Sequence, residues 1–201
     1  MTDNIAQRRV VANIALTFDG RVTGAGGNQD MGWVVPHALS DGVRDFLAQV
    51  HATASTALLG RVNAEGFAAV WPPVATMADA DPRDRAFAQW LNDTEKVILS
   101  STITDIDWEN SRVVDSDTAG LVVELRDNGT DGDILILASV SIIMPLLAAG
   151  LIDRLTVTLC PEILGAGREL FAGGALPGSS WTLTSSKASD SGALALIYDR
   201  A

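Results

Sequence analysis

The sequence of 201 residues contains one cysteine, Cys160, and two histidines, His37 and His51. A single cysteine excludes an intramolecular disulfide and a zinc site built from several thiolates. The two histidines form no HExxH-type pair, so the sequence gives no sign of a transition-metal centre. We therefore expect no metal site. His51 is expected on the surface, near the C-terminal end of a helix, rather than in a catalytic role.

Basic side chains are also scarce, because 14 Lys and Arg stand against 25 Asp and Glu, a formal net charge of −11. This balance argues against nucleic acid or an anionic membrane as a partner, since no basic surplus neutralises phosphates. One phosphorylated small molecule is still compatible with it. No apolar run approaches the roughly 20 residues of a membrane-spanning helix, and the first residues lack the order of a signal peptide. A cytoplasmic location is expected.

The chain does have the composition of a folded protein, with 47% hydrophobic and 19% charged residues. Short β-rich apolar runs alternate with stretches of helical periodicity, which predicts a largely parallel α/β sheet ending in an antiparallel hairpin. We expect one domain over residues 1–201, with its core at about 8–199. Strands are expected at 9–16, 56–59, 96–99, 112–114, 134–137, 154–159, 181–185 and 193–198. Helices are expected at 40–54, 62–69, from 82 onward, 119–128 and 141–149.

Several residues indicate where these helices begin and end. Ser40 and Asp81 are predicted N-caps, and Pro82 suits the first helical position after Asp81. The run Trp-Pro-Pro at residues 71–73 is expected to end the helix before it. Gly129 and Gly150 are expected to stop the two later helices.

Residues 132–153 join a short apolar strand to a helix through the small and hydroxylated residues 138–141. Free backbone N–H groups and the positive end of the helix dipole would point at one spot there. This predicts an anion site. A purely structural β–α unit is the alternative, and the stretch by itself does not separate the two.

Six short motifs occur in one order along the chain: FDG at 18–20, LLGR at 58–61, VILSST at 97–102, GDILILASVS at 132–141, AAGLID at 148–153 and PEILGAGRELF at 161–171. In this order they resemble the reductase domain of bacterial riboflavin biosynthesis, within the dihydrofolate reductase-like superfamily, over about residues 8–199. The resemblance implies a three-layer α/β/α fold around a mostly parallel mixed sheet. It also implies NADPH as hydride donor and a homodimer.

By this resemblance, three loops would hold the cofactor. A helix starting at Gly60 and Arg61 would meet its phosphates, residues 100–102 would approach the adenosine 2′-phosphate, and residues 138–141 would cover the pyrophosphate. The expected cofactor-binding residues are Gly60, Arg61, Asn63, Ser100, Ser101, Thr102, Ala138, Ser139, Val140 and Ser141.

Two departures from the family pattern bear on cofactor binding. Relatives usually carry glycines where this chain has residues 138–140 (ASV), and β-branched Val140 is expected to restrict the backbone there. Relatives usually have Arg-Thr-aromatic where this chain has residues 62–64 (VNA). Asn63 still donates hydrogen bonds, but one positive charge is absent.

Three further residues are assigned to the substrate. Asp19, in a glycine-rich loop that could close over the site, is the catalytic candidate, although a turn-forming role is the simpler interpretation. Trp33 is expected to form a wall of the substrate site. Arg168 is the candidate to meet a substrate phosphate, although a solvated loop arginine is the simpler interpretation. Folate reductases have an acidic residue where this chain has Ala38, which disfavours dihydrofolate as substrate.

The resulting hypothesis is an NADPH-dependent reductase of a small pyrimidine- or pterin-like substrate, with or without a phosphate, resembling 5-amino-6-(5-phosphoribosylamino)uracil reductase. The alternative is a non-catalytic ligand-binding or dimeric protein of the same fold that has lost NADPH binding.

Overall fold

The computed structural model describes residues 8–127, 131–172 and 176–201. Within these residues the strands are β1 (Val10–Thr17), β2 (Ala54–Gly60), β3 (Glu95–Leu99), β4 (Ser111–Val114), β5 (Asp133–Leu137), β6 (Arg154–Cys160), β7 (Trp181–Ala188) and β8 (Leu194–Arg200). They form one sheet in the order β4-β3-β2-β5-β1-β6-β8-β7. The pairs from β4 to β6 are parallel, whereas β8 is antiparallel to both β6 and β7. The predicted parallel sheet with a terminal hairpin is confirmed.

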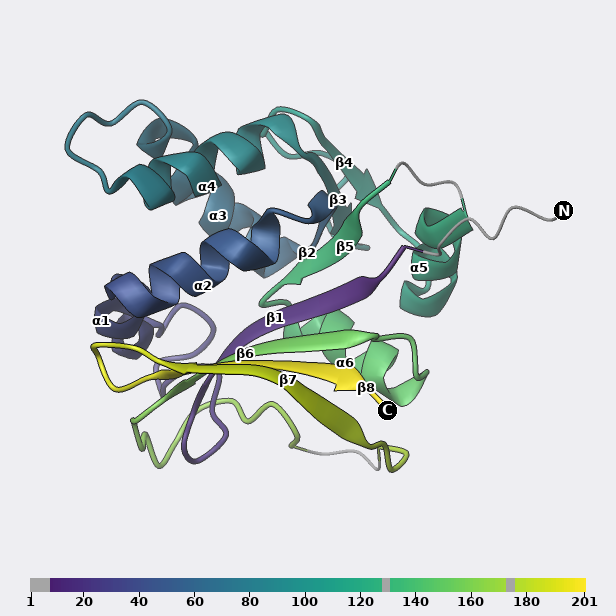
Figure 1. Ribbon diagram of the computed structural model, residues 1–201. Coiled ribbons are helices and arrows are strands. Elements are labelled where there is room, and N and C mark those ends of the chain that lie inside the picture. Colours follow the sequence, from purple (N-terminus) through teal and green to yellow (C-terminus); the bar gives the residue numbers. More distant parts are fainter. Residues whose placement is uncertain (1–7, 128–130, 173–175) are drawn as a thin grey trace, which may run out of the picture.

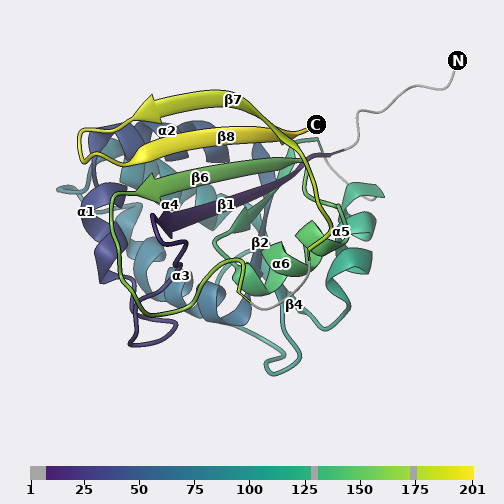
Figure 2. The ribbon, with the colours of Figure 1, turned by 90° about the horizontal axis from the view of Figure 1, so that it is seen from below.

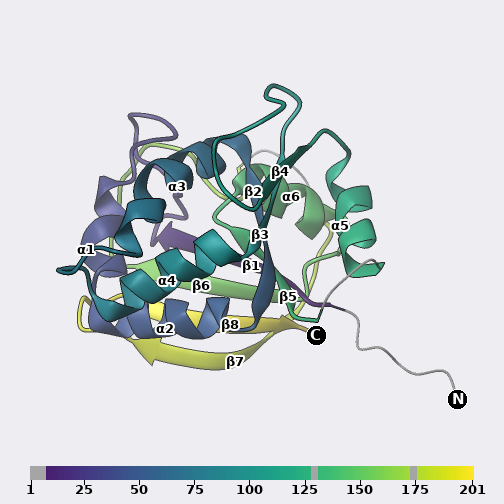
Figure 3. The same ribbon diagram turned by 90° about the horizontal axis from the view of Figure 1, so that it is seen from above.

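Helices cover both faces of this sheet and make three layers (Figure 1). Their bounds are η1 (Gly32–Val34), α1 (Val35–Ala38), α2 (Asp41–His51), α3 (Arg61–Val74), α4 (Pro82–Asp93), α5 (Thr118–Asp127) and α6 (Val140–Ala148). Helices α2, α3 and α4 lie together on one face, and α5 and α6 lie on the other (Figures 1 and 3). The expected three-layer architecture is confirmed. No helix in the described ranges is long and apolar enough to cross a membrane.

Each face of the sheet has its own hydrophobic core. On β5, Ile134 and Ile136 belong to the core under α5 and α6, while Leu135 and Leu137 belong to the core under α2 and α4. Successive side chains of a strand point to opposite faces. Because helices cover both faces of β5, residues 134–137 are all apolar, which is typical of central strands in a parallel sheet.

The strand order reverses between β1 and β5, which are neighbours in the sheet although they are far apart in the sequence. From β1 the chain crosses to β2 on one side, and from β5 it crosses to β6 on the other. Ligands of open α/β sheets bind at the carboxyl ends of strands beside such a reversal. Because these strands are parallel, the carboxyl ends of β1, β2, β3 and β5 share this edge. Figure 2, the view from below, shows the neighbouring strands β1 and β6 ending on the same side of the sheet.

The prolines at 72 and 73 do not end α3 as predicted, because the helix continues through both to Val74. The ring of Trp71 packs edge-on against Phe87 of α4, with 4.6 Å between ring centroids, and lies 6.4 Å from Phe67. Aromatic packing of this kind contributes about 0.5–1.5 kcal/mol beyond burial. The fixed φ of proline also suits a helix, so tertiary contacts retain a last turn that lacks two N–H donors.

The predicted helix ends differ in how they are capped. Asp81 accepts a hydrogen bond from the Arg83 N–H at 2.8 Å, as an N-cap does. Ser40 stands at the N-cap position of α2, but its hydroxyl donates backwards to the His37 carbonyl. Gly150 follows α6 with φ of +68°, which glycine adopts without strain. The predicted stop at Gly129 lies outside the described residues.

A charged cluster joins α2 to α4. The Arg83 guanidinium donates hydrogen bonds to the carboxylates of Asp41, Asp45 and Asp81. Hydrogen bonds from Arg83 hold the pKa of Asp81 well below its usual range and also lower the pKa of Asp45. Because these carboxylates have lower pKa values folded than unfolded, their contribution to stability is present above the unfolded pKa and is lost as pH falls.

We expect the urea midpoint of the protein to fall as pH drops from about 5 to about 2, a window that begins just above the unfolded pKa of Asp, about 3.9, and extends toward the lowered folded values. Arg83→Gln removes the partner of these carboxylates and should make this fall shallower. Arg85→Gln is the matched control, because Arg85 on the same helix donates only to backbone carbonyls. An Arg83→Gln variant that loses stability as steeply as the wild type would contradict this account.

Candidate functional site

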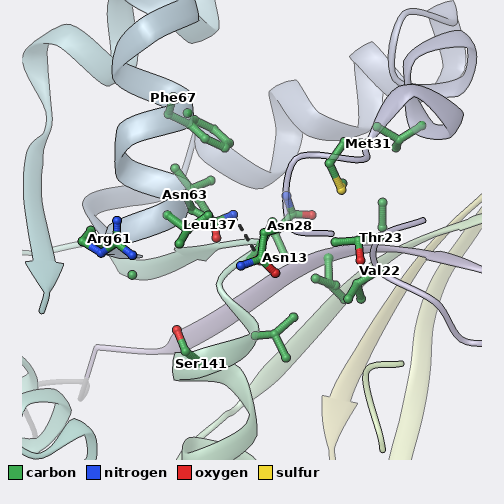
Figure 4. Close-up of a pocket in the computed structure, with 18 of the residues that line it drawn as sticks. Asn13, Val22, Thr23, Asn28, Met31, Arg61, Asn63, Phe67, Leu137 and Ser141 are labelled. Atoms are coloured by element: carbon green, nitrogen blue, oxygen red, sulfur yellow. Dashed lines mark hydrogen bonds between the residues drawn. The ribbon is translucent and has the colours of Figure 1, made fainter. Parts of the chain in front are cut away.

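A cavity of about 850 Å³ opens at the carboxyl ends of β1, β2, β3 and β5 (Figure 4). One end is polar and is lined by the segments that follow β2, β3 and β5. The other end is largely apolar and is lined by side chains of α2, α3 and the loop after β1. In Figure 4, Arg61 and Asn63 approach it from α3, Ser141 from α6 and Asn13 from β1.

Two helix N-termini meet at the polar end. Helix α3 begins after Gly60 and α6 begins after Ser139, and neither has a side-chain cap. The two come so close that a Cβ added at Gly60 would lie 2.8 Å from Ser141 Oγ. Uncapped first-turn N–H groups and the positive ends of two helix dipoles favour an anion at this point.

The side chain of Ser139 fixes this convergence. Its hydroxyl accepts a hydrogen bond from the Gly60 N–H at 2.9 Å and donates one to the Leu137 carbonyl at 3.0 Å. Ser139 is 1% exposed and does not line the cavity. It therefore joins the ends of β2 and β5, in place of the direct cofactor contact that the sequence suggested.

In the loop after β5, the residue with an unusual backbone conformation is Ala138. Its φ is +51°, in the left-handed region that costs a non-glycine residue about 1–2 kcal/mol. Val140, where we expected the restriction, begins helix α6, packs in the core and also lines the cavity. The unusual backbone conformation of this loop lies at Ala138, two residues before Val140.

Two further polar side chains at this end, those of Asn63 and Ser100, hold loops in place. Asn63 donates its amide N–H to the Ala138 carbonyl at 3.2 Å. The Ser100 hydroxyl accepts hydrogen bonds from the N–H groups of Thr102 and Ile103, at 3.1 and 3.3 Å. Arg61 pairs with Glu65 on the next turn of α3. All the predicted cofactor residues except Ser139 line the cavity.

Residues 8–195 match the model of the RibD C-terminal domain. The chain belongs to the RibD C-terminal domain family. It is 26% identical over 171 residues to the uncharacterized protein YyaP of Bacillus subtilis, an alignment that covers 85% of this chain and 84% of YyaP.

Solved structures show the same fold. A putative riboflavin biosynthesis protein from Shewanella sp. PV-4 superposes with a TM-score of 0.70 at 19% identity, over 96% of this chain and 99% of that one. Dihydrofolate reductase from Enterococcus faecalis, complexed with NADP(H) and RAB-propyl, gives a TM-score of 0.61 at 19% identity, over 96% and 97% of the two chains. The dihydrofolate reductase-like fold is therefore confirmed.

The catalytic candidate Asp19 lies outside the residues that line the cavity. Its carboxylate accepts hydrogen bonds from the Thr17 hydroxyl at 2.6 Å and from the N–H groups of Leu164 and Gly165. The hydrogen bond from Thr17, followed by those from the backbone, lowers the pKa of Asp19 to about 2. Asp19 thus ties the loop after β1 to the loop after β6, as a turn residue does.

The two substrate candidates are placed differently. Trp33 does not line the cavity and packs beside the buried Val43, Cys160 and Ala193. Arg168 does line it. Arg168 is brought there because its segment lies against the loop after β1, where the Val22 N–H donates to the Arg168 carbonyl at 2.8 Å.

His51 is buried, so the expectation of a surface histidine is wrong. Its ring lies 5.3 Å from Phe87 and 5.4 Å from Trp90, between centroids, and it lines the apolar end of the cavity. Burial lowers the pKa of His51, which favours the neutral imidazole. Helix α4 covers this end of α2, a contact that no local sequence signal indicated.

Several lining residues have no counterpart among the sequence predictions. The polar ones are Asn13, Thr23, Asn28, Gln29, Asp115, Ser116 and Thr158, and the aromatic ones are Phe67, Trp71 and Phe87. Asn13 carried a usable signal, since it is an amide within an otherwise apolar strand. In the described part of the chain, no three His, Cys, Asp or Glu side chains gather as a metal site would require.

Ser139→Ala should lower the free energy of unfolding by about 1–3 kcal/mol, because the buried Gly60 N–H loses its acceptor. Ser141→Ala, at an exposed position nearby, should change it by less than about 0.5 kcal/mol. Urea denaturation measures both. Equal effects of the two substitutions would contradict the role given to Ser139.

Ala138→Gly should raise the free energy of unfolding by up to about 1 kcal/mol, because glycine relieves the left-handed strain but is more flexible unfolded. Ala148→Gly, in the last turn of α6, should instead lower it by about 0.5–1 kcal/mol. If both glycines destabilise to the same extent, Ala138 is not strained.

Proposed function

We propose that the protein is a reductase that transfers a hydride from a reduced nicotinamide dinucleotide to a carbonyl or imine carbon of a small pyrimidine- or pterin-like substrate, with or without a phosphate. The observation that carries this proposal is the meeting of two uncapped helix N-termini at the polar end of one large cavity. Membership of the RibD C-terminal domain family supports it. NADPH is the form that the resemblance implies, and the Enterococcus faecalis neighbour is a complex with NADP(H).

The residues present fit the diphosphate of such a cofactor. The first N–H groups of α3 and α6 would donate to it, and the missing side chain of Gly60 leaves the room for both helices to approach. Ser141, which is exposed at the cavity, adds a hydroxyl donor. When bound, the cofactor supplies the hydride, so the protein has to hold and orient the two reactants.

The apolar end of the cavity would receive the substrate ring. Aromatic side chains of α3 and α4 and aliphatic side chains of α2 exclude water there, while Asn13, Asn28 and Gln29 supply amides for hydrogen bonds. Among the described residues lining this end, Arg168 is the charged one at neutral pH, because burial favours neutral His51. This end suits a neutral or anionic substrate better than a protonated pterin, and Ala38 lines it without a carboxylate.

A non-catalytic ligand-binding or dimeric protein of the same fold is the second candidate. The observation that favours it is the placement of Asp19, which leaves the cavity without the carboxylate expected to act on substrate. Hydride transfer needs no nucleophile from the protein, so this observation leaves the reductase as the better proposal. A homodimer is proposed from the family resemblance alone.

Titration of the purified protein with NADPH and with NADH, followed by nicotinamide fluorescence, tests the proposal. We expect saturable binding of at least one cofactor, and its oxidation when a pyrimidine or pterin carbonyl compound is added. Absence of binding of both at millimolar concentration would remove the reductase proposal. Binding without oxidation across such a panel would favour the non-catalytic candidate.

Gly60→Ala should weaken cofactor binding at least about tenfold, equivalent to about 1.4 kcal/mol, because the new Cβ meets Ser141 where the helices converge. Gly178→Ala adds the same methyl group in open space and should leave affinity unchanged. Thermal unfolding of both variants checks that the fold persists. Undiminished binding by a folded Gly60→Ala variant would place the diphosphate elsewhere.

A further inference from the structure

The polar end of the cavity is closed by β3 and β4, and a carboxylate stands there. Strands β3 and β4 are parallel, with Leu99 opposite Val114, and the Ser100 N–H donates to the Val114 carbonyl at 3.0 Å. Asp115 is the next residue after Val114, and both it and Ser100 line the cavity. The segment that the sequence assigned to the 2′-phosphate of NADPH therefore has an acid as its neighbour.

The positively charged side chain at this end of the cavity, that of Arg61, already has an acidic partner. Arg61 is the one cation among the described residues that line it, and its Nη1 donates to both carboxylate oxygens of Glu65, at 3.0 and 2.9 Å. Asp115 is exposed and makes no hydrogen bond or ion pair with any described residue. Beside Ser100, Asp115 is therefore the charged side chain without a partner among the described residues that line this end.

The N-terminus of helix α5, which lies close to Asp115 in the sequence, has two first-turn N–H groups that are already paired, so they do not offset the negative charge of Asp115. The carboxylate of Asp117 accepts hydrogen bonds from the N–H groups of Ala119 and Gly120, at 3.0 and 3.1 Å. The first donors of this helix are thus occupied by a side chain, unlike those of α3 and α6. A second acid, rather than an anion-binding helix end, follows Asp115.

These charges suit a ribose hydroxyl and oppose a phosphate. A phosphate monoester carries a charge of about −1.5 to −2 near neutral pH. Dinucleotide sites accept a 2′-phosphate beside an arginine, whereas an aspartate or glutamate accepts a hydrogen bond from the free 2′-hydroxyl. Here the guanidinium is paired and the carboxylate is free.

We infer that the adenosine end of the cavity is built for a dinucleotide with a free 2′-hydroxyl, so that the protein binds NADH at least as tightly as NADPH, with Asp115 as the residue that sets this preference. The inference rests on the proposed function, because it assumes that a nicotinamide dinucleotide occupies the cavity. It changes the form of the cofactor that the family resemblance implies.

Binding of NADH and NADPH is measured by nicotinamide fluorescence for the wild type and for Asp115→Asn. For the wild type we expect a dissociation constant for NADH equal to or below that for NADPH. Asp115→Asn should lower the dissociation constant for NADPH about tenfold relative to that for NADH. Added salt should narrow the wild-type difference, because it screens the repulsion between the phosphate and the carboxylates.

Asp127→Asn is the matched control, since it removes the same charge at the far end of α5, and its ratio should equal that of the wild type. Glu65→Gln, which frees Arg61, should also shift the ratio toward NADPH. A wild-type dissociation constant for NADPH below that for NADH would overturn this inference and leave the reductase proposal standing. An unchanged ratio in Asp115→Asn would overturn the role of Asp115, and absence of binding of both cofactors would overturn the inference together with the reductase proposal.

Discussion

The contact between the ends of β2 and β5 is the constraint on which the site depends. A buried serine hydroxyl, that of Ser139, satisfies the Gly60 N–H and the Leu137 carbonyl at once. Glycine at position 60 leaves room for the Ser141 hydroxyl, which would lie 2.8 Å from an added Cβ. With this contact in place, α3 and α6 both begin at the cavity, and neither N-terminus has a side-chain cap. The sheet, its crossovers and its two cores serve to bring these strand ends together.

The same contact explains the backbone strain at Ala138 in the loop after β5. To pass from a buried strand into α6, the backbone turns sharply at Ala138, which takes a left-handed conformation. The Ala138 carbonyl is then fixed by the amide of Asn63. Strain of this kind persists where surrounding contacts determine the conformation, and it is found most often at functional sites. Its position here, between two helix N-termini, agrees with a site that is formed before any ligand arrives.

Much of the fold could be predicted because its signals are local. Apolar β-rich runs separated by helical periodicity mark a parallel sheet, and residues such as Asp81 and Gly150 mark helix ends through their own backbone chemistry. The three loops that we assigned to a cofactor could be placed at one sheet edge because each follows a strand of that sheet. The predictions that failed concern long-range contacts. His51 is buried because α4 packs over it, and α3 continues through two prolines because Trp71 packs against Phe87. The Asp19 carboxylate accepts a hydrogen bond from a loop about 145 residues later in the chain.

The sequence by itself therefore determined the class of fold, the family and the three loops that gather at one sheet edge. These follow from hydrophobic period, turn chemistry and motif order, all of which act over short stretches of chain. Tertiary structure decided which side chains line the cavity and that buried Ser139 hydrogen-bonds the ends of β2 and β5. It also placed Asp115 beside Ser100 and paired Arg61 with Glu65. Those facts depend on distances between residues far apart in the chain, and only packing fixes such distances.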